Sequence, residues 1–261
     1  MKYRFLLVAL VLGACLLPAA EQAWAQKPDV AIVAAASSTL TDPRFTDPQA
    51  KLLGTGQFNS VTIVDCITKT PTLAELLAYD AVITWSNTNY FSGEALGNVL
   101  ADYVDAGGGV VVAVYANSTT TANRYLAGRW ITGGYEVIPS RSGTTTGQQF
   151  LGTILVPGHP IMQGVNTFDG GTSSARPTTV DVTAGSTKIA QWTDGKTLVA
   201  VGANPHRVDL GMYPPSNAVS SGFWNQTTDG AILMANALTY SIPEPATLAL
   251  LGLGLVLARR R

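Results

Sequence analysis

Side chains able to act as nucleophiles or bases are few in this sequence. Between residues 26 and 242 the candidate thiol is Cys66, and the chain has two histidines, His159 and His206. Covalent catalysis needs a nucleophile held beside a base, and no Gly-x-Ser-x-Gly turn supplies a serine instead. Both histidines stand next to a proline, so we predict that their rings brace turns. We expect Cys66 to be an inert, half-buried thiol.

Sequence patterns that bind metals or phosphates are missing as well. The chain has no His-x-x-x-His, no Cys-x-x-Cys and no Asp-rich calcium loop. Asp42 and Asp47 stand before prolines, as turn and cap residues do. The glycines at 107–109 precede an apolar run, whereas a phosphate-binding loop follows a strand and opens a helix. We therefore expect no metal site and no cofactor.

Hydroxyl, amide and aromatic side chains gather where we expect strands to end. Ser37 follows the first apolar run, Asn87 and Tyr90 follow the third, and Tyr115 and Asn117 follow the fourth. Hydroxyls and amides hydrogen-bond to sugars, and aromatic faces stack on them. The same residue types also populate ordinary loops. Two interpretations stay open, a binding site for a neutral sugar and plain loop chemistry.

The first half of the chain alternates strand and helix patterns. Apolar runs predict strands at 30–36, 61–64, 81–85 and 110–114, and helical patterns lie around 48–53, 73–77 and 92–105. This alternation predicts a parallel sheet with helices on both faces. Ligands of such sheets bind where the strands end.

The second half is less regular and richer in strands. Strand-like segments occur at 135–138, 150–156, 179–182, 188–192, 198–202 and 208–212. Loops rich in glycine and threonine join several of them. We predict that they continue the sheet and add a β-rich insertion. A final helix over 229–240 packs on the sheet.

The body resembles class I glutamine amidotransferase-like domains of the trehalose-utilisation type. The similarity runs through YDAVITWSNTNYFSGEALGNVLADYVDAGGGVVVAVY, then Gly158-His159-Pro160-Ile161, then RVDLGMYPPSNAV and DGAILMANALTY. It implies an α/β, flavodoxin-like three-layer sandwich with a mainly parallel sheet. Tyr115 stands near where the nucleophilic cysteine of the family would be. A phenol, with a pKa of about 10 in water, is a poor acyl acceptor at neutral pH, so we do not expect the amidotransferase reaction.

The amino terminus has the pattern of a secretory signal peptide. Two basic residues, Lys2 and Arg4, precede an apolar run that ends at Ala23-Trp24-Ala25 before Gln26. We predict that signal peptidase cleaves after Ala25 and removes residues 1–25. A lipoprotein-type box ending at Cys15 is the alternative.

The carboxyl terminus combines prolines, an apolar run and arginines. Pro243-Glu244-Pro245 separates the domain from an uncharged stretch, 246–258, which Arg259, Arg260 and Arg261 follow. As a helix the stretch spans roughly 20 Å, short of the ~30 Å hydrocarbon core. The arginines would stay on the cytoplasmic side. We predict a transmembrane helix held only transiently in the inner membrane; a permanent anchor is the alternative.

This terminal segment, residues 243–261, resembles the PEP-CTERM sorting signal of Gram-negative bacteria. The proline motif, apolar run and arginine cluster stand in the family's order. The resemblance implies recognition and cleavage by an exosortase-type transpeptidase. It further implies delivery to the cell surface or the exopolysaccharide matrix of a biofilm.

Charge and length limit the class of the domain, residues 26–242. The chain has a net charge of −1, and its two ends hold more basic than acidic residues, so the domain between them is acidic. An acidic domain offers no electrostatic footprint for nucleic acid. Its length fits one domain with its own core. Cys66 alone survives processing, so no internal disulfide forms.

Together these patterns predict an exported, non-catalytic protein of the cell surface or exopolysaccharide matrix with a binding or structural role. A saccharide-modifying or hydrolytic enzyme that uses the strand-end cleft with His159 or His206 and a carboxylate is the alternative.

Overall fold

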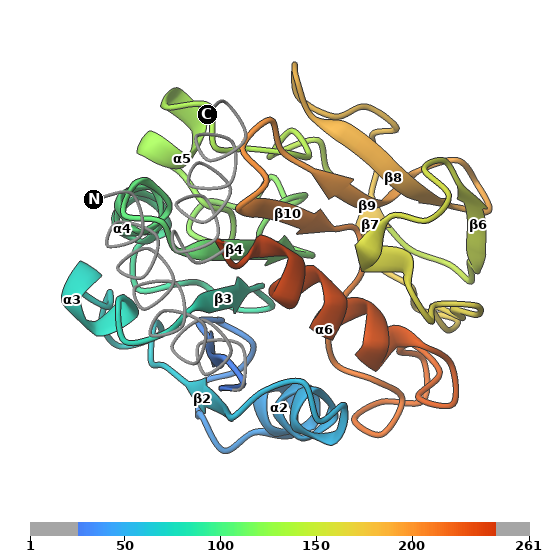
Figure 1. Ribbon diagram of the computed structural model, residues 1–261, viewed down its shortest axis with the longest axis horizontal. Helices are drawn as coiled ribbons and strands as arrows, with labels where there is room; N and C mark the ends of the chain where they lie inside the picture. Colours follow the sequence, from blue (N-terminus) through green and yellow to red (C-terminus); the bar gives the residue numbers. More distant parts are fainter. Residues whose placement is uncertain (1–25, 244–261) are drawn as a thin grey trace, which may run out of the picture. The chain divides into compact units, whose positions relative to one another are not determined.

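A mostly parallel sheet of eight strands organises the residues that the computed structural model describes, 26–243 (Figure 1). Its strand order is β2-β1-β3-β4-β10-β9-β8-β6. The strands are β1 (Asp29–Ile32), β2 (Ser60–Ile63), β3 (Ala81–Thr84), β4 (Gly109–Ala113), β6 (Leu151–Ile154), β8 (Thr187–Trp192), β9 (Thr197–Val201) and β10 (Arg207–Leu210). A small second sheet pairs β5 (Thr144–Thr145) with β7 (Arg176–Pro177).

The sheet changes direction along its width. Strands β2, β1, β3, β4 and β10 run parallel to one another, whereas β9, β8 and β6 continue the sheet in antiparallel fashion. The central strands β3 and β4 are buried along their whole length. Their uninterrupted apolar runs fit this position, because helices cover both faces.

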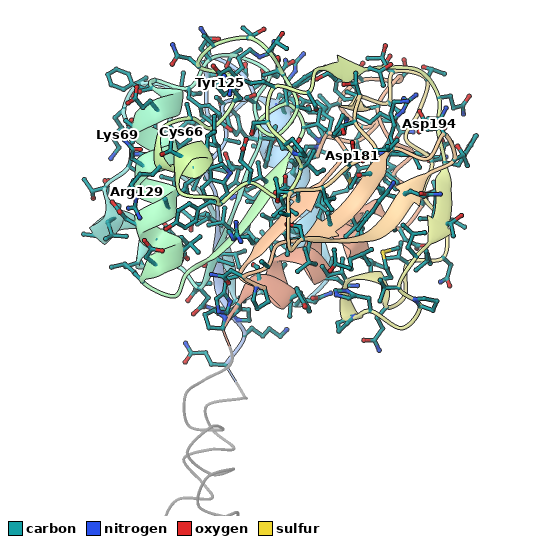
Figure 2. The ribbon with its side chains drawn as sticks, turned by 90° about the horizontal axis from the view of Figure 1, so that it is seen from above. Cys66, Lys69, Tyr125, Arg129, Asp181 and Asp194 are labelled. Atoms are coloured by element: carbon teal, nitrogen blue, oxygen red, sulfur yellow. The ribbon has the colours of Figure 1, made fainter. Side chains whose placement is uncertain are left out.

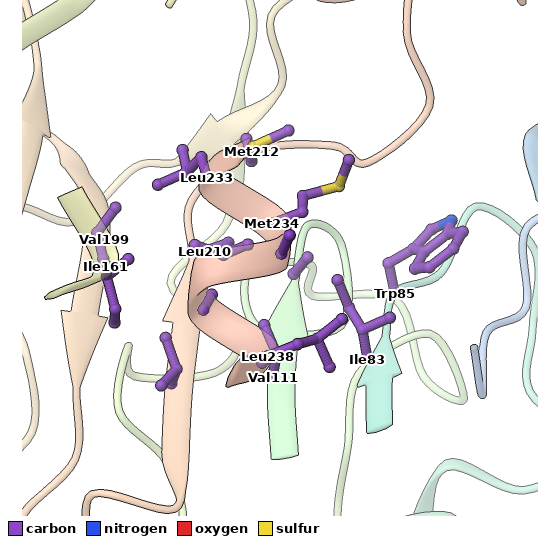
Figure 3. Packing of buried hydrophobic residues seen from close by; sticks show 14 of the residues in the cluster. Ile83, Trp85, Val111, Ile161, Val199, Leu210, Met212, Leu233, Met234 and Leu238 are labelled. Carbon is purple, nitrogen blue, oxygen red and sulfur yellow. The ribbon is translucent and has the colours of Figure 1, made fainter. Parts of the chain in front are cut away.

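One face of the sheet is covered by α2 (Pro43–Gly54), α6 (Gly230–Ser241) and the short 3₁₀ helix η1 (Pro160–Met162). Figure 3 shows Leu233, Met234 and Leu238 of α6 in the same apolar cluster as Val111 and Leu210 of the sheet. Burying a leucine contributes roughly 1.5–3 kcal/mol, so this helix is a main support of the sheet.

The other face is covered by α3 (Leu73–Leu76), α4 (Gly93–Asp105) and α5 (Arg129–Thr132) (Figure 1). The start of α4 is fixed by Ser92, whose hydroxyl accepts a hydrogen bond from the Ala95 N–H at 3.1 Å. Thr72 and Glu75 form a capping box at the start of α3. Such caps satisfy N–H groups that the helix itself leaves unpaired.

The predicted α/β sandwich with a mainly parallel sheet is confirmed. Two segments expected as strands, 135–138 and 179–182, are irregular instead. Thr183, the residue after the second segment, donates a backbone hydrogen bond to Val137 O of the first at 2.8 Å. The Ile138 N–H is taken by the Asp209 carboxylate at 3.0 Å. Because this side chain replaces a strand partner, the apolar run does not extend the sheet.

The predicted signal peptide (1–25) and the sorting segment beyond Pro243, including its predicted transmembrane helix, lie outside the described residues. Within 26–243, no helix is both long enough and apolar enough to cross a membrane.

Candidate functional site

The carboxyl ends of four parallel strands lie level with one another. Backbone pairing continues beyond β1 and β3 as a bridge between Ala35 and Ser86. Tyr115 N then donates to Ser86 O at 3.3 Å, and Val114 N donates to Met212 O at 3.1 Å. The segments after β1, β3, β4 and β10 therefore form one continuous edge, which we call the strand-end rim. Open α/β sheets bind their ligands at this edge.

Tyr115 lies at the centre of the strand-end rim and is half-buried. The Arg124 guanidinium carbon lies 4.7 Å from the centre of its ring. On the β10 side the ring of Tyr213 lies 5.8 Å from it, centre to centre, at 56°. Tyr115 was predicted at the rim, whereas Arg124 and Tyr213 were not. Arg124 lies in a loop well after β4. No residue pattern in that loop predicts that it folds back to the rim.

Ser37 stands at the β1 end of the rim, as predicted, and takes part in a small polar cluster. Its hydroxyl donates to Asp42 Oδ2 at 2.7 Å, and Asp42 pairs with Arg44 at 3.3 Å. Burial acts to raise the pKa of Asp42. Hydrogen bonds from the Arg44 N–H and the Ser37 hydroxyl, with the Arg44 charge, nevertheless hold that pKa below its ordinary value. Asp42 is therefore a weak base at neutral pH.

The other three predicted rim residues differ in accessibility. Asn87 is half-buried, and its backbone N–H donates to Ala35 O at 2.7 Å. Tyr90 is 2% exposed and Asn117 is 1% exposed. The Tyr90 hydroxyl bonds to Thr84 Oγ1 at 2.7 Å. Both side chains thus support the rim from below, and their contact with a ligand stays a prediction.

A buried carboxyl lies beneath Asn117. Asp209 of β10 accepts hydrogen bonds from Ile138 N at 3.0 Å and from Asn117 Nδ2 at 3.3 Å. Burial raises the pKa of this carboxyl to about 7, against the lowering effect of those hydrogen bonds. Sequence analysis did not identify it, because an isolated acid in an apolar strand pattern gives no sign of its depth.

The thiol that the sequence offers is unreactive here. Cys66 is buried, and its Sγ donates to Ala34 O at 2.9 Å. Burial raises the pKa of the thiol well above its ordinary value, so the nucleophilic thiolate is not formed at neutral pH. Figure 2 shows Cys66 at the end of the molecule that carries Lys69 and Arg129, away from Asp194.

Both histidines lie at the opposite edge of the sheet from Tyr115. His206 directly precedes β10, its carbonyl accepts from the Val110 N–H at the start of β4, and its Nδ1 is 3.0 Å from Ser241 O. His159 accepts from Ile161 N at 3.3 Å, and its ring lies 4.7 Å from that of Tyr240 in the last turn of α6. Burial lowers the pKa of His159. Both rings make bracing contacts of the kind expected.

No group of three or more potential metal-binding side chains occurs in the described part of the chain. A groove of about 750 Å³ lies elsewhere on the surface, between α2, η1 and α6. Three of its polar side chains bond to one another, since Gln57 Nε2 donates to Asn236 Oδ1 at 3.1 Å and the Thr239 hydroxyl donates to Gln57 Oε1 at 2.9 Å. Because these groups are already paired, we place the candidate site at the strand-end rim.

The chain carries an export signal that a family model matches. The model of the PEP-CTERM protein-sorting motif covers residues 241–261. This motif marks the chain as an exported protein that passes the membrane and is processed by exosortase. No curated protein matches the chain.

Solved structures share the fold of the domain. A ThuA-like protein from Bacteroides uniformis is 12% identical over 82% of this chain and 91% of its own, with a TM-score of 0.54. A cytoplasmic protein from Salmonella typhimurium is 13% identical over 82% of this chain and 100% of its own, with a TM-score of 0.56. A ThuA-like protein from Parabacteroides merdae is 11% identical over 84% and 93%, with a TM-score of 0.51. The chain thus joins a PEP-CTERM sorting motif to a domain with the fold of ThuA-like proteins, a flavodoxin-like fold of the class I glutamine amidotransferase-like type.

Proposed function

We propose that the protein is a non-catalytic saccharide-binding protein of the cell surface or exopolysaccharide matrix, with its binding site at the strand-end rim. The observation that carries this proposal is that the rim residues and the two histidines lie at opposite edges of the sheet. Tyr115 stands at the rim, while His159 and His206 are held at the opposite edge. The rim offers Ser37 and Asn87 as hydrogen-bonding groups without a matched nucleophile and base.

Export supports a role outside the cell. In this proposal signal peptidase cleaves between Ala25 and Gln26, and exosortase then cleaves near Pro243-Glu244-Pro245. The inner membrane holds the protein only between these steps. The mature domain remains at the surface or in the matrix of a Gram-negative biofilm, where exopolysaccharide is the abundant partner.

The alternative, a saccharide-modifying or hydrolytic enzyme, requires a base at the rim. Of the acids near the rim, Asp42 is bound by Ser37 and Arg44 and has a lowered pKa, whereas Asp209 is buried beneath it. Neither is matched to general-base work on an exposed ligand. The geometry therefore favours binding over turnover.

Retention on immobilised exopolysaccharide tests the proposal with the exported protein. We expect Tyr115→Ala to weaken retention about 3- to 10-fold, the effect of losing one well-placed aromatic ring. Tyr240→Ala is the matched control, because this half-buried tyrosine lies at the opposite edge. Equal retention of Tyr115→Ala and wild type, or release of sugar that stops in His206→Gln, would overturn the proposal.

A further inference from the structure

Three buried hydrogen-bonding groups at the strand-end rim have no partner among residues 26–243. They are Arg44 Nε, Arg124 Nε and the Tyr213 hydroxyl, and the acceptor Asn117 Oδ1 and the donor Trp85 Nε1 nearby are unpaired as well. Tyr213 is only 7% exposed. A buried polar group left without a hydrogen bond destabilises the folded state, and folded proteins leave few such groups. Three of them in one neighbourhood are therefore a sign of a site built to receive an acceptor.

Two of the three groups lie beside Tyr115, and the third, Arg44, lies on the Tyr213 side of the cluster. Arg124 stacks on the Tyr115 ring at 4.7 Å, and the ring of Tyr213 lies 5.8 Å from it. Burial raises the pKa of Tyr213, while the charges of Arg44 and Arg124 act to lower it. Both guanidinium groups thus lie close enough to act on the phenol. Arg44 keeps 36% of its side chain exposed, so the cluster can be reached from solvent.

The cluster carries an uncompensated positive charge. Arg44 is neutralised by Asp42 at 3.3 Å, whereas Arg124 forms no ion pair with any carboxylate of the described region. A guanidinium group has a planar fork of N–H donors that matches a carboxylate. In an otherwise acidic domain, this cluster is a local site for an anion.

We infer that the strand-end rim binds the carboxylate of an acidic saccharide, with Arg124 as its charge partner and Arg44 and the Tyr213 hydroxyl as additional donors. Tyr115 orients the Arg124 guanidinium by stacking on it. The inference rests on the proposed function and narrows the ligand from saccharides in general to those that carry a carboxylate.

Calorimetric titration of the exported protein with two oligosaccharides of equal length tests this inference. A galacturonic acid trimer supplies the carboxylate, and a galactose trimer lacks it. We expect the acidic trimer to bind at least 10-fold more tightly, and raised salt to weaken it. Arg124→Gln should remove this preference. Tyr213→Phe, which deletes only the hydroxyl, should weaken binding of the acidic trimer about 3- to 10-fold.

Arg129→Gln is the matched control, because Arg129 also stacks on a tyrosine, Tyr135, at 5.7 Å, but pairs with Asp105 near the end of α4. It should change binding less than two-fold. Equal binding of both trimers, unaffected by Arg124→Gln, would overturn the inference and leave the proposed function standing. No binding of either trimer would overturn both. Displacement of the acidic trimer by equimolar acetate would refute the statement that the ligand is a saccharide, because the carboxylate alone would then account for binding. Unchanged thermal unfolding of each variant shows that it is folded.

Discussion

The two edges of the parallel sheet use similar residue types in different ways. At the amino-terminal edge, His206 and Ser241 are joined by a 3.0 Å contact, and His159 packs on Tyr240. At the carboxyl-terminal edge, Arg124 and Tyr213 keep polar atoms without partners among the described residues. The contacts of the two histidines hold the fold together, whereas the unpaired donors beside Tyr115 are available to a ligand.

This difference shows that the type of a residue does not by itself reveal its role in this protein. Histidine is the side chain most often used for acid–base catalysis, yet both histidines here join loops to α6. The rim presents arginine, tyrosine, serine and asparagine side chains, and neither histidine lies there. The rim lies at the edge where open α/β sheets bind ligands, and Tyr115 stands at its centre.

The largest effect we expect concerns the acid beneath the rim. The pKa of Asp209 is raised from 3.8 to about 7 in the folded protein, so the folded state favours the protonated form. Its contribution to stability is fully present below pH ~4 and is lost as pH rises towards 7, by up to about 4 kcal/mol. Asp209→Asn should remove this fall, measured by chemical denaturation between pH 4.5 and 8. An unchanged slope would contradict this account, because it would mean that folding leaves the pKa of Asp209 unaltered.

A smaller effect is expected from adding a methyl group at the closely packed amino-terminal edge. A Cβ on Gly109 would lie 2.5 Å from the Ser241 hydroxyl oxygen and 2.7 Å from its carbonyl oxygen. Gly109→Ala should therefore displace the end of α6 and cost about 1–3 kcal/mol. Gly54→Ala, where nothing lies within 4 Å, should cost less than about 0.5 kcal/mol. If both variants unfolded at the same denaturant concentration, the packing of this edge would be looser than described.

The fold followed from the sequence wherever an apolar run was buried on both faces. The runs at 81–85 and 110–114 contain β3 and β4, because strands covered by helices on both sides need no polar alternation. The run at 135–138 does not form a strand, because the Ile138 N–H donates its hydrogen bond to the Asp209 side chain of β10. A pattern of residue types does not reveal such a distant partner.

The rim was predictable by position more than by composition. Ser37 and Tyr115 lie at the edge because each directly follows a buried apolar run, 30–36 and 110–114. Tyr90 and Asn117 follow strands too, but they turn inward to bond with Thr84 and Asp209. Arg124 reaches the rim through an irregular loop, which hydrophobic periodicity does not describe.

The smallest effect is expected at the histidines. His159→Gln should change stability by less than about 1 kcal/mol and leave saccharide binding unchanged, because the ring braces a turn through one 3.3 Å hydrogen bond. Titration calorimetry and thermal unfolding of the variant provide the check. A 10-fold loss of affinity in a folded variant would move the site to the amino-terminal edge.

Hydrogen–deuterium exchange of the exported protein, with and without the galacturonic acid trimer, tests most directly that the strand-end rim is the binding edge. The account predicts slower exchange in the segments that carry Ser37, Tyr115, Arg124 and Tyr213, with no change around His159 and His206. Protection confined to the histidine segments, or to the groove between α2 and α6, would contradict it.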